Sequence, residues 1–172
     1  MRKIIASVLS VIHYFLFGLL LLLFHPIQWC ALKIGGYKPH KATVSILNYL
    51  LVLIQRGVGH TVWFCNIDRI PTGVPVIVAS NHQSMNDIPA FFWYLRKYHP
   101  KFIAKKELGK GIPSVSINLN HGGSVLIDRK DSKQSIPAII AFAKYIEQNK
   151  YAAIIFPEGT RSRTGVPKKF SA

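Results

Sequence analysis

The pattern of hydrophobic positions changes near residue 60. Upstream of it, residues 4–24 form an uncharged run of 21 residues, interrupted only by two serines, one histidine and one glycine. At about 1.5 Å per residue, a helix of this length could cross a hydrocarbon core of about 30 Å. We interpret it as a retained membrane anchor. It is long for a signal peptide and lacks a small-residue cleavage site, and it is apolar on all faces, unlike a buried core helix.

A second apolar stretch covers residues 44–54 and is too short to span a bilayer. Between the two stretches, Trp29, Lys33, Lys38 and Lys41 have the aromatic and basic composition of a membrane interface. Either the first helix spans and the second lies in the interface, or both form a hairpin that dips into one leaflet. The basic residues after the first run favour the cytoplasmic side for the rest of the chain. We therefore expect membrane-anchoring helices over residues 1–57 and a second domain over residues 58–172.

Beyond residue 60, short apolar or β-branched runs alternate with helical spacing. Strands are predicted over residues 61–67, 76–79, 101–104, 124–127 and 152–156. One helix is predicted to follow His82 and to continue through Trp93 and Arg96. Another is predicted to begin at a Ser132 cap, with Pro137 in its first turns. This alternation predicts an α/β domain with a mostly parallel sheet flanked by helices, preceded by one or two membrane-associated helices.

Composition narrows the function classes. The 22 Lys and Arg against 7 Asp and Glu give a net charge of +15, and 49% of the 172 residues are apolar, which excludes intrinsic disorder. Two cysteines cannot form a disulfide framework, and no Cys/His spacing suits zinc. The charge indicates anionic membrane, nucleic acid or a phosphorylated substrate as partner. Nucleic acid is disfavoured because the charge is spread along the chain and no binding motif is present.

Polar residues gather after two predicted strands, where the chemistry of such sheets collects. His82 and Asp87 follow the first of them, and five helical residues would turn them apart. They can meet only if His82 lies in the loop and Asp87 in the first turn of the helix. The carboxylate would then fix the imidazole tautomer, so that the other ring nitrogen acts as a base for a substrate hydroxyl. The alternative is that Asp87 is a helix cap and His82 a loop residue.

The second cluster is Glu158, Gly159, Thr160 and Arg161. A glycine lets backbone N–H groups approach an anion, and a guanidinium binds phosphate with two prongs, while Glu158 could orient the arginine. The alternative is a surface turn with an ion pair. Arg129 ends a third strand, and Lys105 precedes a helix start; each is also explained as an exposed charged group.

Taken together, these segments resemble the glycerolipid acyltransferases of the 1-acylglycerol-3-phosphate type. The Asn-His-x4-Asp motif of that family is matched by Asn81, His82 and Asp87, and its Phe-Pro-Glu-Gly-Thr-Arg-Ser block by residues 156–162. Further matches are Lys-Glu-Leu at 106–108 and Gly-x4-Asp-Arg at 123–129. The resemblance covers roughly residues 66–170. Because that family continues with further strands, we expect the acyltransferase domain to be a fragment that lacks its C-terminal part.

The resemblance implies a mechanism and partners. His82, oriented by Asp87, deprotonates the hydroxyl of a lysophospholipid acceptor, which attacks the thioester of acyl-CoA or acyl carrier protein. Glu158, Gly159, Thr160 and Arg161 hold the acceptor phosphate, with Arg129 and Lys105 assisting. No metal and no cofactor beyond the thioester co-substrate are implied, and the expected location is the membrane. Other acceptors stay open (glycerol-3-phosphate, another lysophospholipid or a lyso-aminolipid), as does a non-catalytic lipid-binding protein.

Overall fold

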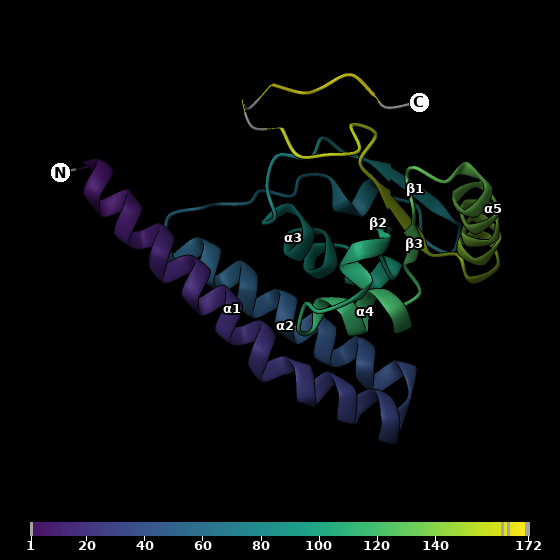
Figure 1. Cartoon of the computed structure of the whole chain (residues 1–172), viewed down its shortest axis with the longest axis horizontal. Helices are drawn as coiled ribbons and strands as arrows, with labels where there is room; N and C mark the ends of the chain where they lie inside the picture. Colours follow the sequence, from purple (N-terminus) through teal and green to yellow (C-terminus); the bar gives the residue numbers. More distant parts are fainter. Residues whose placement is uncertain (1, 163, 165, 171–172) are drawn as a thin grey trace.

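The computed structural model describes residues 2–162, 164 and 166–170. Two long helices come first: α1 (Arg2–Gly35) and α2 (Tyr37–Gly57). Gly36 joins them with φ 73°, a left-handed backbone that glycine adopts without steric cost. The two helices run side by side in opposite directions along one side of the molecule (Figure 1). The predicted first helix is thus confirmed, and it extends through Pro26 to Gly35.

The rest of the described chain is an α/β unit. Its strands are β1 (Val76–Ala79), β2 (Lys101–Lys105), β3 (Val125–Ile127) and β4 (Ala152–Ile155). They form one sheet in the order β1-β4-β2-β3, and every pairing is parallel. The helices are α3 (Asp87–Tyr94), α4 (Val115–His121) and α5 (Ser132–Asn149). The predicted fold class is confirmed.

Helices cover both faces of the sheet (Figure 1). On one face, Leu95, Tyr98 and Phe102 pack with Ala152 and Ile154, and α3 adds its phenylalanines to this core. On the other face, Phe142 and Ile146 of α5 pack on Ala153 of the central strand β4. Burial on both faces explains why β4 is a continuous apolar run rather than an alternating one. The α1–α2 pair packs against α3 and α4, and the start of α2 also reaches β2, where Tyr37 Oη accepts the Lys101 ammonium at 2.7 Å.

One predicted strand is wrong. Residues 61–66 have no regular structure, and a 3-10 turn follows at Ile67–Arg69. The β-branched and aromatic composition is used for packing instead: the Phe64 ring stacks on Tyr94 at 4.7 Å between centroids and meets Phe91 edge-on at 5.9 Å. Trp63 stays 83% exposed. Because this segment pairs with no strand, its β propensity is not realised.

Smaller differences concern helix ends. The helix predicted through Arg96 ends at Tyr94, and Arg96–Tyr98 forms a 3-10 turn. The cap of α5 is Asp131 rather than Ser132, because the Asp131 carboxylate accepts a bond from the Gln134 N–H. Helix α4 was not predicted. The division of the chain at residue 57 stays a prediction, although α2 ends there, and the predicted domain end at Ala172 lies outside the described residues.

Candidate active site

The loop after β1 and the first turn of α3 bring His82 and Asp87 together. His82 lies in the loop and Asp87 is the first residue of α3, as the sequence required. The imidazole Nδ1 lies 3.0 Å from Asp87 Oδ2. The same oxygen accepts the backbone N–H groups of Gln83 at 2.9 Å and Ser84 at 3.0 Å. Asp87 therefore orders the whole loop and fixes the orientation of the ring.

Two opposing effects act on the Asp87 carboxyl. Burial raises its pKa, but the hydrogen bonds from His82, Ser84 and Gln83 favour the charged form and outweigh burial. The net pKa of Asp87 lies below its ordinary value. Asp87 is therefore a carboxylate at neutral pH, which suits it to stabilise an imidazolium on His82.

The other side of the His82 ring is open to a substrate. The ring stacks on Phe156 with centroids 4.2 Å apart, and its side chain keeps 18% of its surface exposed. Within the described part of the chain, Nε2 has no hydrogen-bond partner. With Nδ1 donating to Asp87, the free Nε2 is the basic nitrogen. The geometry thus provides an oriented base beside an aromatic wall.

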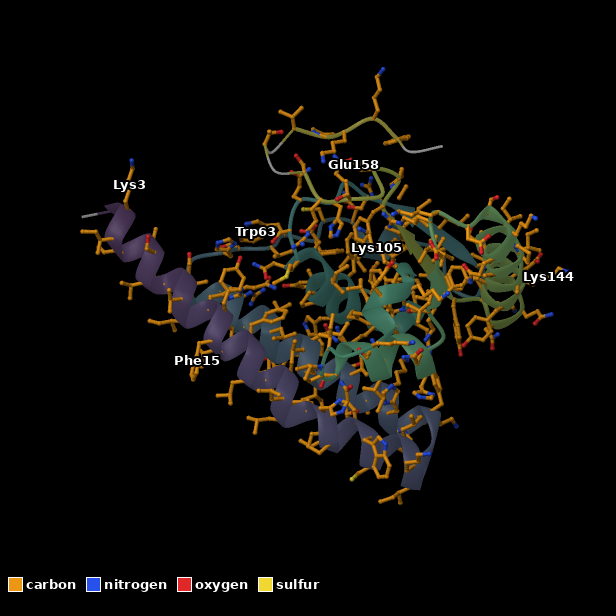
Figure 2. All side chains as sticks on the ribbon, in the orientation of Figure 1. Lys3, Phe15, Trp63, Lys105, Lys144 and Glu158 are labelled. Atoms are coloured by element: carbon orange, nitrogen blue, oxygen red, sulfur yellow. The ribbon has the colours of Figure 1, made fainter. Side chains whose placement is uncertain are left out.

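Glu158 has a different environment from the one expected. It is 4% exposed and accepts two backbone N–H groups, from His82 to Oε1 at 3.0 Å and from Lys168 to Oε2 at 2.8 Å. Figure 2 shows it in the turn that lies under the C-terminal segment. Among the described residues, Glu158 forms no salt bridge or side-chain hydrogen bond with Arg161. Both of its oxygens are occupied, so Glu158 braces the His82 loop, and Ser162 adds a second tie by donating its N–H to the His82 carbonyl at 2.8 Å.

The turn around Gly159 requires a glycine. Its φ is 66°, and its N–H donates to the Phe156 carbonyl at 2.9 Å, which closes a tight turn at the end of β4. This turn directs Thr160 and Arg161 to the exposed surface. The residues of the second cluster are therefore split: Glu158 is buried, and Thr160 and Arg161 are exposed.

Unpaired cations mark the carboxyl edge of the sheet. Lys105 ends β2, Arg129 follows β3 and Arg161 follows β4, and all three are exposed. Of the residues that the structure describes, only His82 and Asp87 form a salt bridge, so these cations are uncompensated. Because parallel strands end at one edge, the three cations and His82 share that edge. The arrangement suits a phosphorylated substrate whose hydroxyl reaches His82.

Both N-terminal helices reach this loop, which sequence reasoning missed. Asn86, next to Asp87, accepts a bond at Oδ1 from His13 Nε2 of α1 over 3.2 Å. Its carbonyl accepts the Gln55 side-chain N–H of α2 at 3.2 Å. His13 is 4% and Gln55 is 1% exposed. Polar residues inside otherwise apolar helices were the available signal, and their partner was not visible in the sequence.

This chain matches a family model and is similar to known proteins. A family model described as Acyltransferase matches residues 62–172. The 1-acyl-sn-glycerol-3-phosphate acyltransferase of Helicobacter pylori (strain J99 / ATCC 700824) is 42% identical over 106 residues, which are 58% of this chain and 42% of that protein. The alpha form from Ovis aries is 30% identical over 122 residues, which are 71% of this chain and 42% of that protein. The chain thus spans less than half the length of these two relatives.

A solved structure shares the fold. It is the crystal structure of the 1-acyl-sn-glycerophosphate (LPA) acyltransferase PlsC from Thermotoga maritima, with a TM-score of 0.76 and 25% identity. The match covers 99% of this chain and 67% of that one. The N-terminal helices are therefore included in the likeness, together with the sheet.

Proposed function

The chain belongs to the acyltransferase family, and on that premise we propose that it transfers a fatty acyl group from a thioester to the free hydroxyl of 1-acyl-sn-glycerol-3-phosphate. The product is phosphatidic acid, for phospholipid biosynthesis. The observation that carries the proposal is the 3.0 Å contact between His82 Nδ1 and Asp87 Oδ2, which leaves Nε2 open at the carboxyl edge of the sheet. The names of the similar proteins support this acceptor.

The proposed reaction uses general base catalysis. His82 Nε2 takes the proton of the acceptor hydroxyl as its oxygen attacks the thioester carbonyl carbon. The new C–O bond forms, the C–S bond breaks, and the imidazolium returns its proton to the thiolate. Asp87 stabilises the imidazolium between these steps, because its carboxylate lies against Nδ1. All proton transfers use one side chain, and no acyl-enzyme forms.

The acceptor phosphate is proposed to bind the uncompensated cations. Arg161 is the principal group, since a guanidinium can donate two parallel bonds to a phosphate. Lys105 and Arg129 assist from the neighbouring strands, and Gly159 and Thr160 shape the turn. Glu158 acts on the site through His82 rather than through the phosphate, because its oxygens are already bonded to backbone N–H groups. The donor is proposed to be acyl-CoA or acyl carrier protein.

The contacts of α1 favour insertion into one leaflet rather than a crossing. By length and composition, Lys3–Gly35 could span a bilayer. However, His13 binds Asn86, the Leu21 carbonyl accepts the Ser114 hydroxyl at 2.7 Å, and His25 Nδ1 accepts the Ser114 N–H at 3.0 Å. These ties extend over about 18 Å of the helix at about 1.5 Å per residue. A crossing helix would draw the polar loops of Asn86 and Ser114 into the hydrocarbon, where backbone groups are costly.

The outer face of α1 matches this arrangement. Phe15 is 68% exposed and points away from the α/β unit (Figure 2). Other exposed apolar side chains continue along the helix, among them Ile4, Val11 and Leu22. This face can lie in the acyl region while the opposite face holds the enzyme at the interface. We propose that the α1–α2 hairpin dips into the cytoplasmic leaflet, which places the carboxyl edge of the sheet next to its lipid substrate.

The test is acyl transfer to lysophosphatidic acid by the full-length protein and by a His82→Ala variant. Loss of a general base lowers the turnover number by about 10²–10⁴-fold, with unchanged membrane binding and thermal unfolding. Comparing acyl-CoA with acylated carrier protein identifies the donor. A folded His82→Ala protein with near-normal turnover would refute the mechanism. Absence of turnover in the wild type would favour a non-catalytic lipid-binding protein.

A further inference from the structure

A basic groove lies at the edge of the sheet opposite to the candidate active site. It is an open pocket of about 700 Å³ between the start of α2, the 3-10 turn after α3 and the residue before β4. Its polar lining includes Lys38, Lys41, Arg96, Lys97 and His99. Since all strands are parallel, their amino ends lie here, and His82 and Arg161 lie at the far edge. The groove is therefore a separate feature from the acyl transfer site.

A buried lysine lines a small cavity next to the groove. Lys101, the first residue of β2, is 5% exposed, and its ammonium donates to Tyr37 Oη at 2.7 Å and to the Gly122 carbonyl at 2.6 Å. The Tyr37 and Tyr151 rings lie 5.0 and 5.1 Å from the same nitrogen. None of the seven acidic residues of the chain lines the groove. Buried charges in proteins are usually paired, so this lysine lacks its expected anionic partner.

Lys41 and Lys101 lie close enough to affect the pKa values of the groups around them. Burial, together with repulsion from Lys41, lowers the pKa of Lys101 to about 8. Burial followed by the charges of Lys41 and Lys101 lowers the pKa of His99 to about 4. His99 is therefore neutral at physiological pH, and its Nε2 accepts the Lys41 ammonium at 2.8 Å. A bound anion would compensate these crowded cations without competing with a carboxylate.

A second, independent observation points into the same place. His40 is fully buried, and neither of its ring nitrogens makes a well-formed hydrogen bond with a described residue, although the Gln28 backbone lies near the ring. It lines a small cavity of about 20 Å³ that adjoins the groove and is shared with Tyr37, Lys41 and Lys101. That volume holds about one water molecule. An unsatisfied buried imidazole is costly, and a water linking it to a groove ligand would satisfy it.

From the uncompensated lysine, the acid-free lining and the unpartnered histidine, we propose that this groove binds a phosphate group at a site distinct from the acyl transfer centre. The phosphate can come from an anionic lipid headgroup or from a soluble phosphate. The headgroup is favoured by the nearby end of α1, where the Lys33 ammonium lies 5.8 Å from the Trp29 ring, a pairing typical of membrane interfaces. The groove would then fix the orientation of the hairpin end at the lipid surface.

The experiment compares single-charge variants in binding assays that need no turnover. Lys41→Gln removes a groove cation, and Lys144→Gln removes an exposed cation of α5 that does not line the groove (Lys144 is labelled in Figure 2). Inorganic phosphate is titrated by calorimetry at constant ionic strength. Vesicles of phosphatidylcholine with and without phosphatidylglycerol are titrated by flotation. Since a charge-assisted hydrogen bond is lost, Lys41→Gln weakens binding to at least one phosphate probe by about tenfold or more.

The outcomes distinguish a lipid headgroup from a soluble phosphate, and both of these from a general effect of net charge. A tenfold loss for vesicles alone identifies a headgroup, and a loss for inorganic phosphate identifies a soluble ligand; both support the proposal. Equal small losses in Lys41→Gln and Lys144→Gln refute it, because they show only the general effect of net charge. A groove-dependent loss of binding to an acidic carrier protein, with both phosphate probes unaffected, also refutes it. If Lys41→Gln does not fold, exposed Lys97 replaced by Gln gives the same comparison.

Discussion

Replacing Glu158 by glutamine tests the brace that holds the candidate catalytic loop. The carboxylate accepts the His82 N–H at 3.0 Å and the Lys168 N–H at 2.8 Å, and the side chain is buried. A glutamine keeps one accepting oxygen but turns an NH₂ group toward the other N–H. One charge-assisted hydrogen bond is lost and two donors face each other in a dry site.

The magnitude follows from these two contacts. Loss of a charge-assisted bond and of the partner of a buried N–H gives a destabilisation of about 2–4 kcal/mol. For a chain of this length that corresponds to a fall of roughly 10 °C in Tm. If the His82 backbone shifts by about 1 Å, kcat falls by about 10²-fold. The acceptor KM is expected to change little, because both Glu158 oxygens are bonded to backbone N–H groups.

The assay combines thermal unfolding with steady-state kinetics on lysophosphatidic acid. Glu147→Gln is the matched control, since it removes the same charge from the exposed surface of α5. A Glu158→Gln protein with normal Tm and normal kcat but a raised acceptor KM would contradict the brace. That result would restore the role in phosphate binding expected from the sequence motif.

Three further predictions concern the site and the anchor. Asp87→Asn lowers kcat by about 10²–10⁴-fold, since an amide does not stabilise the imidazolium. The folded pKa of Asp87 is depressed, so the carboxylate stabilises the fold above the unfolded pKa of about 3.9, and this stabilisation is lost as the pH falls through the folded pKa. The variant is therefore expected to lose less stability in acid than wild type in pH-dependent unfolding. Arg161→Ala raises the KM for the acceptor more than that for the thioester, and equal rises would contradict a phosphate contact. High salt leaves the protein in the membrane fraction while detergent releases it, because screening does not weaken apolar anchoring by α1; release by salt alone would contradict it.

The elements that sequence predicted best are those whose pattern is local. The run at Ala152–Ile155 is apolar throughout because β4 is central and covered on both faces, so composition alone identified it. The 82–87 pair was predictable because only one local geometry allows the two side chains to meet. Each of these predictions used residues within a few positions of one another.

The failures depend on partners distant in the chain. Residues 61–66 have strand composition, but no neighbouring strand pairs with them. The role of Glu158 depends on the backbone of His82 and of Lys168, and the motif alone favoured contact with a phosphate. The basic groove draws its residues from segments around 38, 97 and 151, which the packing of α2 on α3 and the parallel sheet bring together. Tertiary contacts, rather than propensity, decide such features.

One residue links the proposed membrane-associated helices to the loop of the candidate active site. Asn86 is held by His13 of α1 and by Gln55 of α2, and it directly precedes the Asp87 that orients His82. Both helix side chains are nearly inaccessible to water, so the cost of leaving either unpaired is high. A hairpin that separated from the α/β unit to cross the bilayer would break both bonds and release the loop. The proposed insertion in one leaflet preserves both bonds, and with them the position of Asp87 beside His82.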